Sequence, residues 1–159
     1  MEGARAAQPD DVPRLAELAR QALAEVRPRR GGATFASREA RPEPLEVSLA
    51  ADLHDAEAVV IAGTIDGVVV GYATGRVELL RDGSRLGVVR DLFVEPGARE
   101  VGVGEAMMTG VLDWFRAADC SGVDAMALPG DRTTKNFFEA AGFTARLLVV
   151  HRDIEEAGP

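Results

Sequence analysis

Residues 99–104, with the sequence REVGVG, form a glycine-bearing stretch that could bind a ligand through its backbone. The stretch follows an apolar run that ends at Glu95-Pro96-Gly97 and precedes a segment with helical spacing. Pro and Gly favour a turn, and a helix that starts beside glycines offers unpaired N–H groups at the positive end of its dipole. Such a helix start can hold a phosphate without a dedicated side chain. Alternatively, the glycines serve only the geometry of a strand-to-helix turn.

Carboxylates on central strands are the side chains that could take a proton from a substrate. Asp91 and Glu78 lie on predicted central strands and Glu57 begins another, so each is a candidate general base. The alternative is that they only face solvent, as most charged residues on half-exposed strands do. His54 and His151 have no partner at a readable spacing, and we interpret both as structural. No cluster of Cys, His and carboxylates has the spacing of metal ligands, so the sequence predicts no metal site.

The length and composition fit one globular domain. The chain has 159 residues, 47% of them hydrophobic, and no apolar run approaches the roughly 20 residues that cross a bilayer. Acidic residues occur in 1–13, where a signal peptide would be apolar, so we predict a cytoplasmic protein without a membrane partner. The formal charge of −8 disfavours nonspecific nucleic-acid binding. The single Cys120 cannot form an internal disulfide, and we interpret it as a small packed side chain.

Strands are predicted from apolar runs rich in Val, Ile and Thr that lie between turn residues. Two of these runs are joined by Asp66-Gly67, a dipeptide typical of a two-residue hairpin, so we expect them to be antiparallel neighbours. The next run should pair antiparallel with the second, and a short apolar patch near the N-terminus could be an edge strand. The predicted strands are 4–7, 57–65, 68–80, 86–94, 123–128 and 145–150.

Helices are predicted where apolar residues recur at spacings of three and four. The first has Asp10 or Asp11 as its cap and Pro13 in its first turn. The strand and helix order indicates an α/β fold with a mixed, mostly antiparallel sheet flanked by helices. We predict a single domain, 1–159, that ends in an acidic tail at 153–159. The predicted helices are 12–26, 45–53, 104–118 and 132–141.

The pattern Arg99-x-x-Gly102-x-Gly104, preceded by the apolar run at 92–94, resembles a known cofactor motif. Neither the dinucleotide order G-x-G-x-x-G nor the Lys-Ser/Thr pair of the P-loop is present. The pattern is similar to the acyl-CoA-binding motif R/Q-x-x-G-x-G/A of the GNAT acetyltransferase superfamily. Residues 123–128 and 135–143 resemble the next strand and helix of that family, so the likeness covers about half of the chain.

The resemblance implies the GNAT fold and an acetyl-CoA-dependent N-acetyltransferase in which an amine of a small molecule or a protein attacks the thioester directly. In the family, the backbone at the end of the motif strand binds the pantetheine, and the N–H groups after it hold the pyrophosphate. Asp131 stands where many members have Asn, after the second splayed strand. Carried onto this sequence, the implied cofactor-binding residues are Phe93, Val94, Arg99, Glu100, Val101, Gly102, Val103, Gly104, Asp131 and Phe138.

Phe138 occupies the position where many members place the tyrosine that protonates the departing CoA thiolate. A phenyl ring has no proton to give, so we expect slow turnover unless another acid serves. One alternative hypothesis is therefore a non-catalytic acyl-CoA-binding regulatory module with the same fold. Another is a nucleotide- or phosphate-binding domain of unrelated chemistry. The sequence does not decide whether the chain forms a homodimer.

Residues 27–44 have no helical or strand periodicity and contain several Pro and Gly, so we predict a long mobile loop. The loop is either an ordinary solvated connection or a lid beside the acceptor pocket. A cluster of guanidinium groups in an acidic protein attracts carboxylates and phosphates, which favours an anionic acceptor. The arginines of this segment are Arg27, Arg29, Arg30, Arg38 and Arg41.

Overall fold

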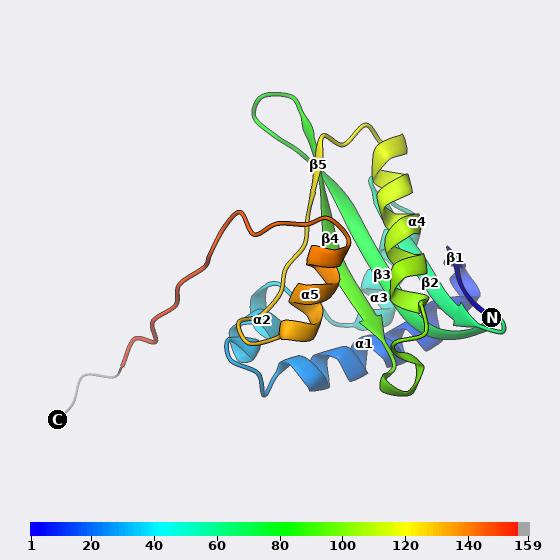
Figure 1. The fold of residues 1–159 in the computed structure, drawn as a ribbon, viewed down its shortest axis with the longest axis horizontal. Coiled ribbons are helices and arrows are strands. Elements are labelled where there is room, and N and C mark those ends of the chain that lie inside the picture. Colours follow the sequence, from blue (N-terminus) through cyan, green and yellow to red (C-terminus); the bar gives the residue numbers. More distant parts are fainter. Residues whose placement is uncertain (156–159) are drawn as a thin grey trace.

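The computed structural model describes residues 1–155, which form a five-stranded sheet flanked by helices (Figure 1). The strands lie side by side in chain order, and every neighbouring pair is antiparallel except β4 and β5. That last pair is parallel because a helix crosses from one strand to the next. The predicted α/β class is confirmed. The strands are β1 (Glu2–Ala6), β2 (Ala58–Ile65), β3 (Val68–Leu79), β4 (Arg85–Val94) and β5 (Gly122–Asp124).

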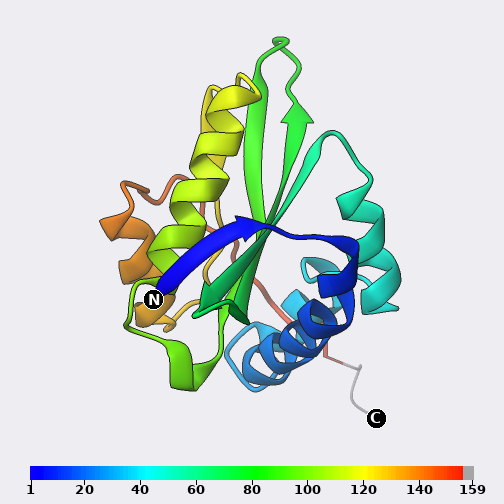
Figure 2. The same cartoon turned by 90° about the vertical axis from the view of Figure 1, so that its right-hand side faces the viewer.

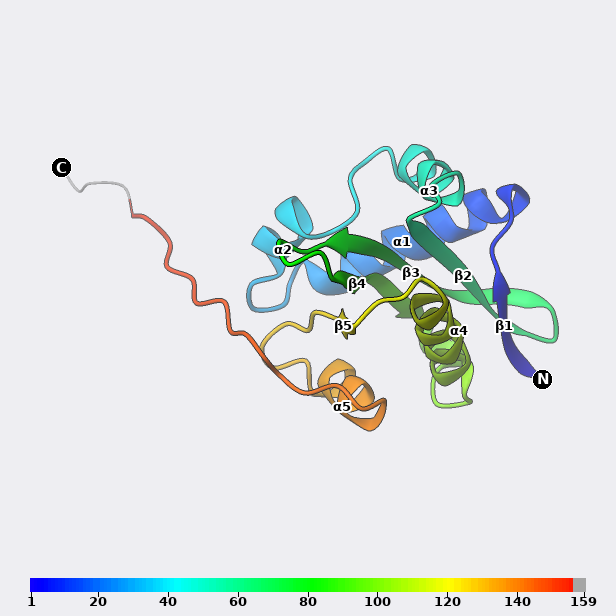
Figure 3. The same cartoon turned by 90° about the horizontal axis from the view of Figure 1, so that it is seen from above.

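The helices form two layers, one on each face of the sheet. Figure 2 and Figure 3 show α1 and α3 on one face and α4 on the other. No helix within residues 1–155 is both long and apolar enough to cross a membrane. The helices are η1 (Pro9–Asp11), α1 (Val12–Val26), α2 (Gly32–Arg38), α3 (Leu45–Leu53), η2 (Pro96–Ala98), α4 (Val103–Ala117) and α5 (Arg132–Ala140).

Each face of the sheet has its own hydrophobic core. In β2, Val60 and Ala62 pack toward α1 and α3, whereas Val59 and Ile61 pack toward α4. This alternation is expected of a strand that is buried on both faces. The α4 side is built around Met107, Val111 and Phe115, and the α1 side around Leu15, Leu18 and Leu49.

The turn between β2 and β3 has the conformation that its dipeptide predicts. Asp66 and Gly67 have φ angles of 48° and 82°, in the left-handed region that a type I′ turn requires at both central positions. The turn places Ile65 opposite Val68 and so fixes the register of the hairpin.

The prediction of an irregular loop over 27–44 is wrong for residues 32–38, which form α2. This helix starts after Gly31, whose φ of 75° suits a residue without a Cβ. Seven residues make only two turns, so their apolar spacing could not be recognised in the sequence. The predicted strand 123–128 is also too long, because β5 ends at Asp124.

The prediction of a last strand at 145–150 is wrong. These residues are exposed and belong to no strand of the described sheet, and Figure 1 shows the segment running away from the body. Apolar, β-branched composition indicates the capacity to form a strand, but a strand also needs a neighbouring edge. The described part of the predicted acidic tail, 153–155, is exposed, and 156–159 lie outside the described residues.

Candidate functional site

β4 and β5 separate shortly after they begin to pair. Their register joins Leu86 to Gly122 and Val88 to Asp124, and β4 then continues to Val94 without β5 beside it. The backbone of residues 89–94 therefore has an open edge on that side within the described sheet. Unpaired N–H and C=O groups of this kind can bind an extended ligand as if it were another strand.

A β-bulge lies at the start of this open stretch. Thr74 pairs with Asp91 while the next residue, Gly75, pairs with Val89, so Arg90 is an extra residue on β4. Bulges bend a strand and change the direction of its side chains, and they are over-represented beside active sites. The bulge directs Asp91 toward Thr74 and Arg41, and Arg90 lines a cavity described below.

The glycine-bearing stretch has a backbone suited to an anion. Glu100 and Gly102 have φ angles of 66° and 97°, so two left-handed residues occur within three positions. For a glutamate this conformation is uncommon, and such strain tends to persist at functional sites. Gly102 is the N-cap of the fifteen-residue α4 and has no side chain to accept the N–H groups of the first turn. These N–H groups and the helix dipole form a concave, positively polarised surface.

The side chain of Arg99 holds this stretch in place through contacts with β4 and α1. Its Nε donates to the carbonyl of Val94 at 2.7 Å, and its Nη2 donates to both carboxylate oxygens of Glu25 at 2.9 and 3.0 Å. The guanidinium also lies over the ring of Phe93, 5.4 Å from its centroid. Arg99 therefore fixes the end of β4 to α1, so the predicted binding of a phosphate by this stretch would rest on backbone N–H groups.

The two implied cofactor residues beyond β5 have clear structural contacts. Asp131 is the N-cap of α5, where it accepts from the Thr134 N–H at 3.2 Å, and Arg29 lies 3.7 Å away. Phe138 is buried, with its ring 5.3 Å from that of Phe143. The cofactor role of both residues stays a prediction. The structure adds Phe137, which sequence reasoning missed and which lies against the first turn of α4.

Asp91 lies at the centre of a buried polar cluster on the α1 and α3 side of the sheet. Its carboxylate accepts from Arg41 at 2.7 and 3.2 Å, from the hydroxyl of Thr74, and from that of Tyr72 at 3.3 Å. Arg41 also pairs with Asp52 at 2.7 Å. The side chain of Arg41 is 6% exposed, so a cation that belongs to the predicted arginine-rich loop is in fact an internal charge.

Electrostatics in this cluster follow from burial and charge pairing. Burial lowers the pKa of Arg41, but the charges of Asp91 and Asp52 and their hydrogen bonds outweigh it, so the net pKa is raised. Burial, together with the nearby charge of Asp91, raises the pKa of Tyr72 well above its ordinary value. Arg41 is thus a permanent cation and Tyr72 a neutral hydroxyl at physiological pH.

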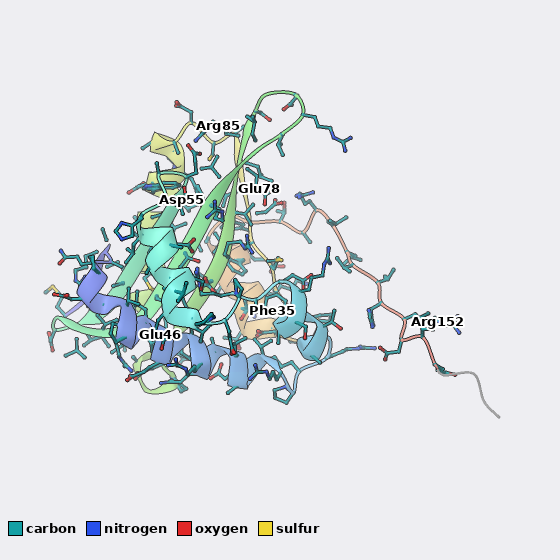
Figure 4. All side chains as sticks on the ribbon, turned by 180° about the vertical axis from the view of Figure 1, so that it is seen from behind. Phe35, Glu46, Asp55, Glu78, Arg85 and Arg152 are labelled. Carbon is teal, nitrogen blue, oxygen red and sulfur yellow. The ribbon has the colours of Figure 1, made fainter. Side chains whose placement is uncertain are left out.

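Glu78 and Glu57 lie away from this cluster. Glu78 is exposed opposite Leu86, and Figure 4 shows it near Arg85 at one end of the sheet, far from Phe35 of α2. Glu57 accepts from Arg85 at 2.7 Å. The structure therefore brings only one of the three candidate bases, Asp91, beside the open stretch of β4. Neither His54 nor His151 belongs to the cluster.

A cavity of about 490 Å³ lies between α1, α2 and β4. Arginines dominate its charged lining, with Glu43 as the one lining carboxylate among the described residues. Arg38 pairs with Glu39 at 2.9 Å, whereas no ion pair within residues 1–155 involves Arg27 or Arg90. Arg29 and Arg30 of the predicted arginine-rich segment do not line this cavity. The lining arginines are Arg27, Arg38, Arg41 and Arg90.

Comparisons with known proteins agree with this arrangement. A family model described as "Acetyltransferase (GNAT) family" matches residues 17–143. The aminoglycoside acetyltransferase AAC(6')-Iy, solved with the bisubstrate analogue CoA-S-monomethyl-acetylneamine, superimposes with a TM-score of 0.73 at 17% identity, over 97% of this chain and 99% of that one.

Two further solved structures share the fold. The aminoglycoside acetyltransferase meta-AAC0020 from an uncultured soil metagenomic sample, in complex with sisomicin, has a TM-score of 0.69 at 20% identity, covering 98% of this chain and 97% of that one. The ribosomal-protein-alanine N-acetyltransferase of Brucella melitensis biovar Abortus 2308 has a TM-score of 0.67 at 17% identity, covering 98% and 100%. Among curated protein sequences, none matches the chain significantly.

Proposed function

Because the chain belongs to the acetyltransferase (GNAT) family, we propose that it transfers the acetyl group of acetyl-CoA to an amine of a small molecule by direct attack. The observation that supports this proposal most strongly is the open edge of β4 at residues 89–94, which leads directly into the uncapped start of α4. One surface thus offers peptide groups for an extended amide chain and N–H groups for a pyrophosphate.

The proposed cofactor site uses backbone far more than side chains. The peptide groups of Phe93 and Val94 bind the pantetheine amides, and the N–H groups from Val101 to Gly104 hold the pyrophosphate. The left-handed Glu100 and Gly102 shape this concave backbone before any ligand arrives. The thioester then lies at the opening between β4 and β5.

The proposed reaction forms a C–N bond and breaks a C–S bond. The neutral amine attacks the thioester carbonyl, the amine loses a proton, and the CoA sulfur leaves as a thiolate that takes up a proton. Asp91 is the best placed of the candidate bases, but Arg41, Thr74 and Tyr72 already use most of its acceptor capacity. We therefore assign Asp91 mainly to the positioning of Arg41, and water to the removal of the amine proton.

The proposed acceptor carries a carboxylate or phosphate besides its amine. Arg27 and Arg90 line the cavity as cations without a carboxylate partner among residues 1–155, and Arg90 is the bulged residue of the open stretch. A guanidinium binds such anions through two parallel hydrogen bonds. An acceptor held there would place its amine toward β4.

Binding and turnover test the proposal in two steps. Calorimetric titration should show binding of acetyl-CoA and of CoA. Binding of ATP alone would instead indicate a nucleotide-binding domain. Release of free CoA in the presence of small amines should follow. A second candidate function, an acyl-CoA-binding module without turnover, is favoured by the phenyl ring of Phe138; tight acetyl-CoA binding with no CoA release across a broad amine panel would establish it.

A matched set of arginine variants tests the acceptor class. Arg27→Gln and Arg90→Gln should each raise KM for an anionic amine about tenfold, which corresponds to one charge-assisted contact of about 1.4 kcal/mol. The exposed Arg30, which does not line the cavity, is the control, and Arg30→Gln should leave KM unchanged. An equal effect of all three variants, or a preference for neutral amines, would contradict the anionic acceptor.

A further inference from the structure

The cavity between α1, α2 and β4 is lined by charges of both signs that do not pair with each other. Arg27 and Arg90 contribute cations and Glu43 contributes a carboxylate. No ion pair or side-chain hydrogen bond within residues 1–155 involves any of the three. Guanidinium and carboxylate groups that can reach each other form strong charge-assisted hydrogen bonds. Unpaired charges of both signs around one cavity therefore fit a ligand that carries both signs itself.

The other charged side chains of the lining have partners outside the cavity. Arg41 pairs with Asp91 and Asp52, and Arg38 pairs with Glu39. None of these three carboxylates lines the cavity. The charges left for a ligand are therefore two cations and one anion.

The backbone fixes the place of Glu43 in this lining. It lies between Pro42 and Pro44, whose rings fix their own φ angles, and a residue before proline is largely confined to extended backbone. On one side, the ion-paired side chain of Arg41 is 6% exposed, and on the other side Leu45 is 2% exposed in the core. The segment is thus anchored at both ends, so little backbone freedom is lost when a ligand binds Glu43.

The size and the remaining lining of the cavity suit a small molecule. Its volume of about 490 Å³ lies within the range of about 300–1,000 Å³ that is usual for small-molecule sites. Leu23, Ala36 and Ala40 add apolar side chains to the lining. Apolar side chains beside separated charges fit a short methylene chain that carries charged groups.

We propose that the acceptor bound in this cavity is a diamino carboxylate, which has an α-amino group beside its carboxylate and a second amine at the end of a short chain. This inference rests on the proposed acetyl transfer and names its acceptor. Arg27 and Arg90 bind the carboxylate, Glu43 accepts hydrogen bonds from the α-ammonium group, and the distal amine extends toward β4. An ammonium group beside two unpaired cations is otherwise repelled, so Glu43 is the residue that selects the α-amino group.

Only the distal amine reacts in this arrangement. As a neutral amine it attacks the thioester carbonyl, so that a C–N bond forms and the C–S bond breaks, and its proton passes through water to the CoA sulfur. The α-ammonium group stays protonated beside Glu43, because a nearby carboxylate favours the charged form. A protonated amine has no lone pair with which to attack. The product is therefore acetylated at the distal amine.

Calorimetric titration with lysine and ornithine, with and without CoA, is the first test. Each should bind about tenfold more tightly than its analogue without the α-amino group and its analogue without the carboxylate. Glu43→Gln should remove the preference for the α-amino group alone, whereas Arg90→Gln should reduce the preference for the carboxylate instead.

A neighbouring carboxylate provides the matched control. Glu46 of α3, labelled in Figure 4, does not line the cavity, so Glu46→Gln should change neither preference. Three results would each overturn the proposal: no binding of lysine or ornithine, equal affinity for them and for their analogues, or equal effects of Glu43→Gln and Glu46→Gln.

Acetyl transfer separates failure of this inference from failure of the proposed function. Fragmentation of the product of lysine and acetyl-CoA in a mass spectrometer should place the acetyl group on the distal amine. Acetylation of the α-amino group, or equal kcat/KM for the analogue without that group, overturns the inference and leaves acetyl transfer standing. Binding of lysine that depends on Glu43, with no CoA release from any amine, would support the selectivity of the cavity and contradict the proposed acetyl transfer.

Discussion

The ring of Phe137 lies against Gly104: a Cβ placed on this glycine would be 3.1 Å from the ring Cε2. The contact joins α5 to the first turn of α4, the turn that would hold the pyrophosphate. A larger residue at position 104 would therefore push on Phe137 as well as on a ligand. A simple Gly104→Val variant cannot separate loss of binding from loss of packing.

We expect Gly104→Ala in a Phe137→Leu background to separate loss of ligand binding from loss of packing. The smaller leucine removes the internal crowding, so the variant should fold, while the added methyl group keeps the phosphate from the N–H groups. Affinity for acetyl-CoA should fall by about tenfold or more, roughly 1.4 kcal/mol in binding free energy, as measured by calorimetric titration. Phe137→Leu alone is the control and should bind nearly as the native protein does. Equal affinity in both variants would argue against a phosphate-binding turn.

Removal of Arg41 should destabilise the fold far more than removal of a surface arginine. Arg41→Met leaves Asp91 as a buried carboxylate without a cation, while Asp52 keeps only Arg76, and breaking a buried pair in this way costs about 3–5 kcal/mol. Arg20→Met breaks the more exposed pair with Glu46 and should cost less than about 1 kcal/mol. Urea unfolding measures both, and addition of Asp91→Asn to Arg41→Met should recover part of the loss. Similar costs for both arginines would show that the cluster is open to water.

The pair between Asp11 and Arg5 should make stability depend on pH in the acid range. Hydrogen bonds from Arg5, at 2.7 and 2.9 Å, hold the pKa of Asp11 below its ordinary value near 3.8. The folded state therefore favours the ionised carboxylate, so this stability is fully present above pH 4 and is lost as the pH falls through the folded pKa. Asp11→Asn should lower the free energy of unfolding at pH 7 by about 1 kcal/mol.

The same variant should also lose less stability than the native protein as the pH falls below 4. Asp10→Asn, next to it, is the control for the loss of one acidic charge at the start of α1. Parallel unfolding curves of the native protein and Asp11→Asn across pH 2 to 7 would contradict the assignment.

Phe138→Tyr tests whether the missing acid limits turnover. We expect slow CoA release by the native protein, because general acid catalysis is typically worth about 10²–10⁴-fold. Phe138 is buried, so the new hydroxyl should raise kcat where it has room and leave kcat unchanged where the packing against Phe143 excludes it. Fast native turnover, insensitive to this substitution, would show that another group protonates the sulfur. Thermal unfolding of the variant controls for damage to the packing.

Local patterns in the sequence predicted the scaffold well, because each depends on neighbouring residues. Asp66-Gly67 specified its hairpin through backbone conformation, and the apolar spacing of 12–26 specified α1. The turn for which we propose phosphate binding was recognisable for the same reason: its glycines lie two positions apart and directly precede a helical pattern. The motif and the fold class could therefore be predicted from the sequence alone.

The proposed acceptor side could not be predicted in the same way, because its contacts join residues far apart in the chain. Arg41 meets Asp91 fifty positions later, and nothing in either local sequence indicates the pairing. Arg90 joins the cavity only because a bulge redirects β4. The error at 145–150 has another origin: the composition of a strand is present, but these residues pair with no strand of the described sheet.

The pairing of β1 with β2 has a consequence for the order of folding. Glu2 pairs with Ile65 and Ala6 with Ile61, so this edge closes a loop of more than fifty residues that contains η1 and three α-helices. β2, β3 and β4 are joined by short turns and can meet with little loss of chain entropy, whereas β1 must wait until the intervening helices have packed. The N-terminal strand should therefore dock last during refolding and detach first under mild denaturant.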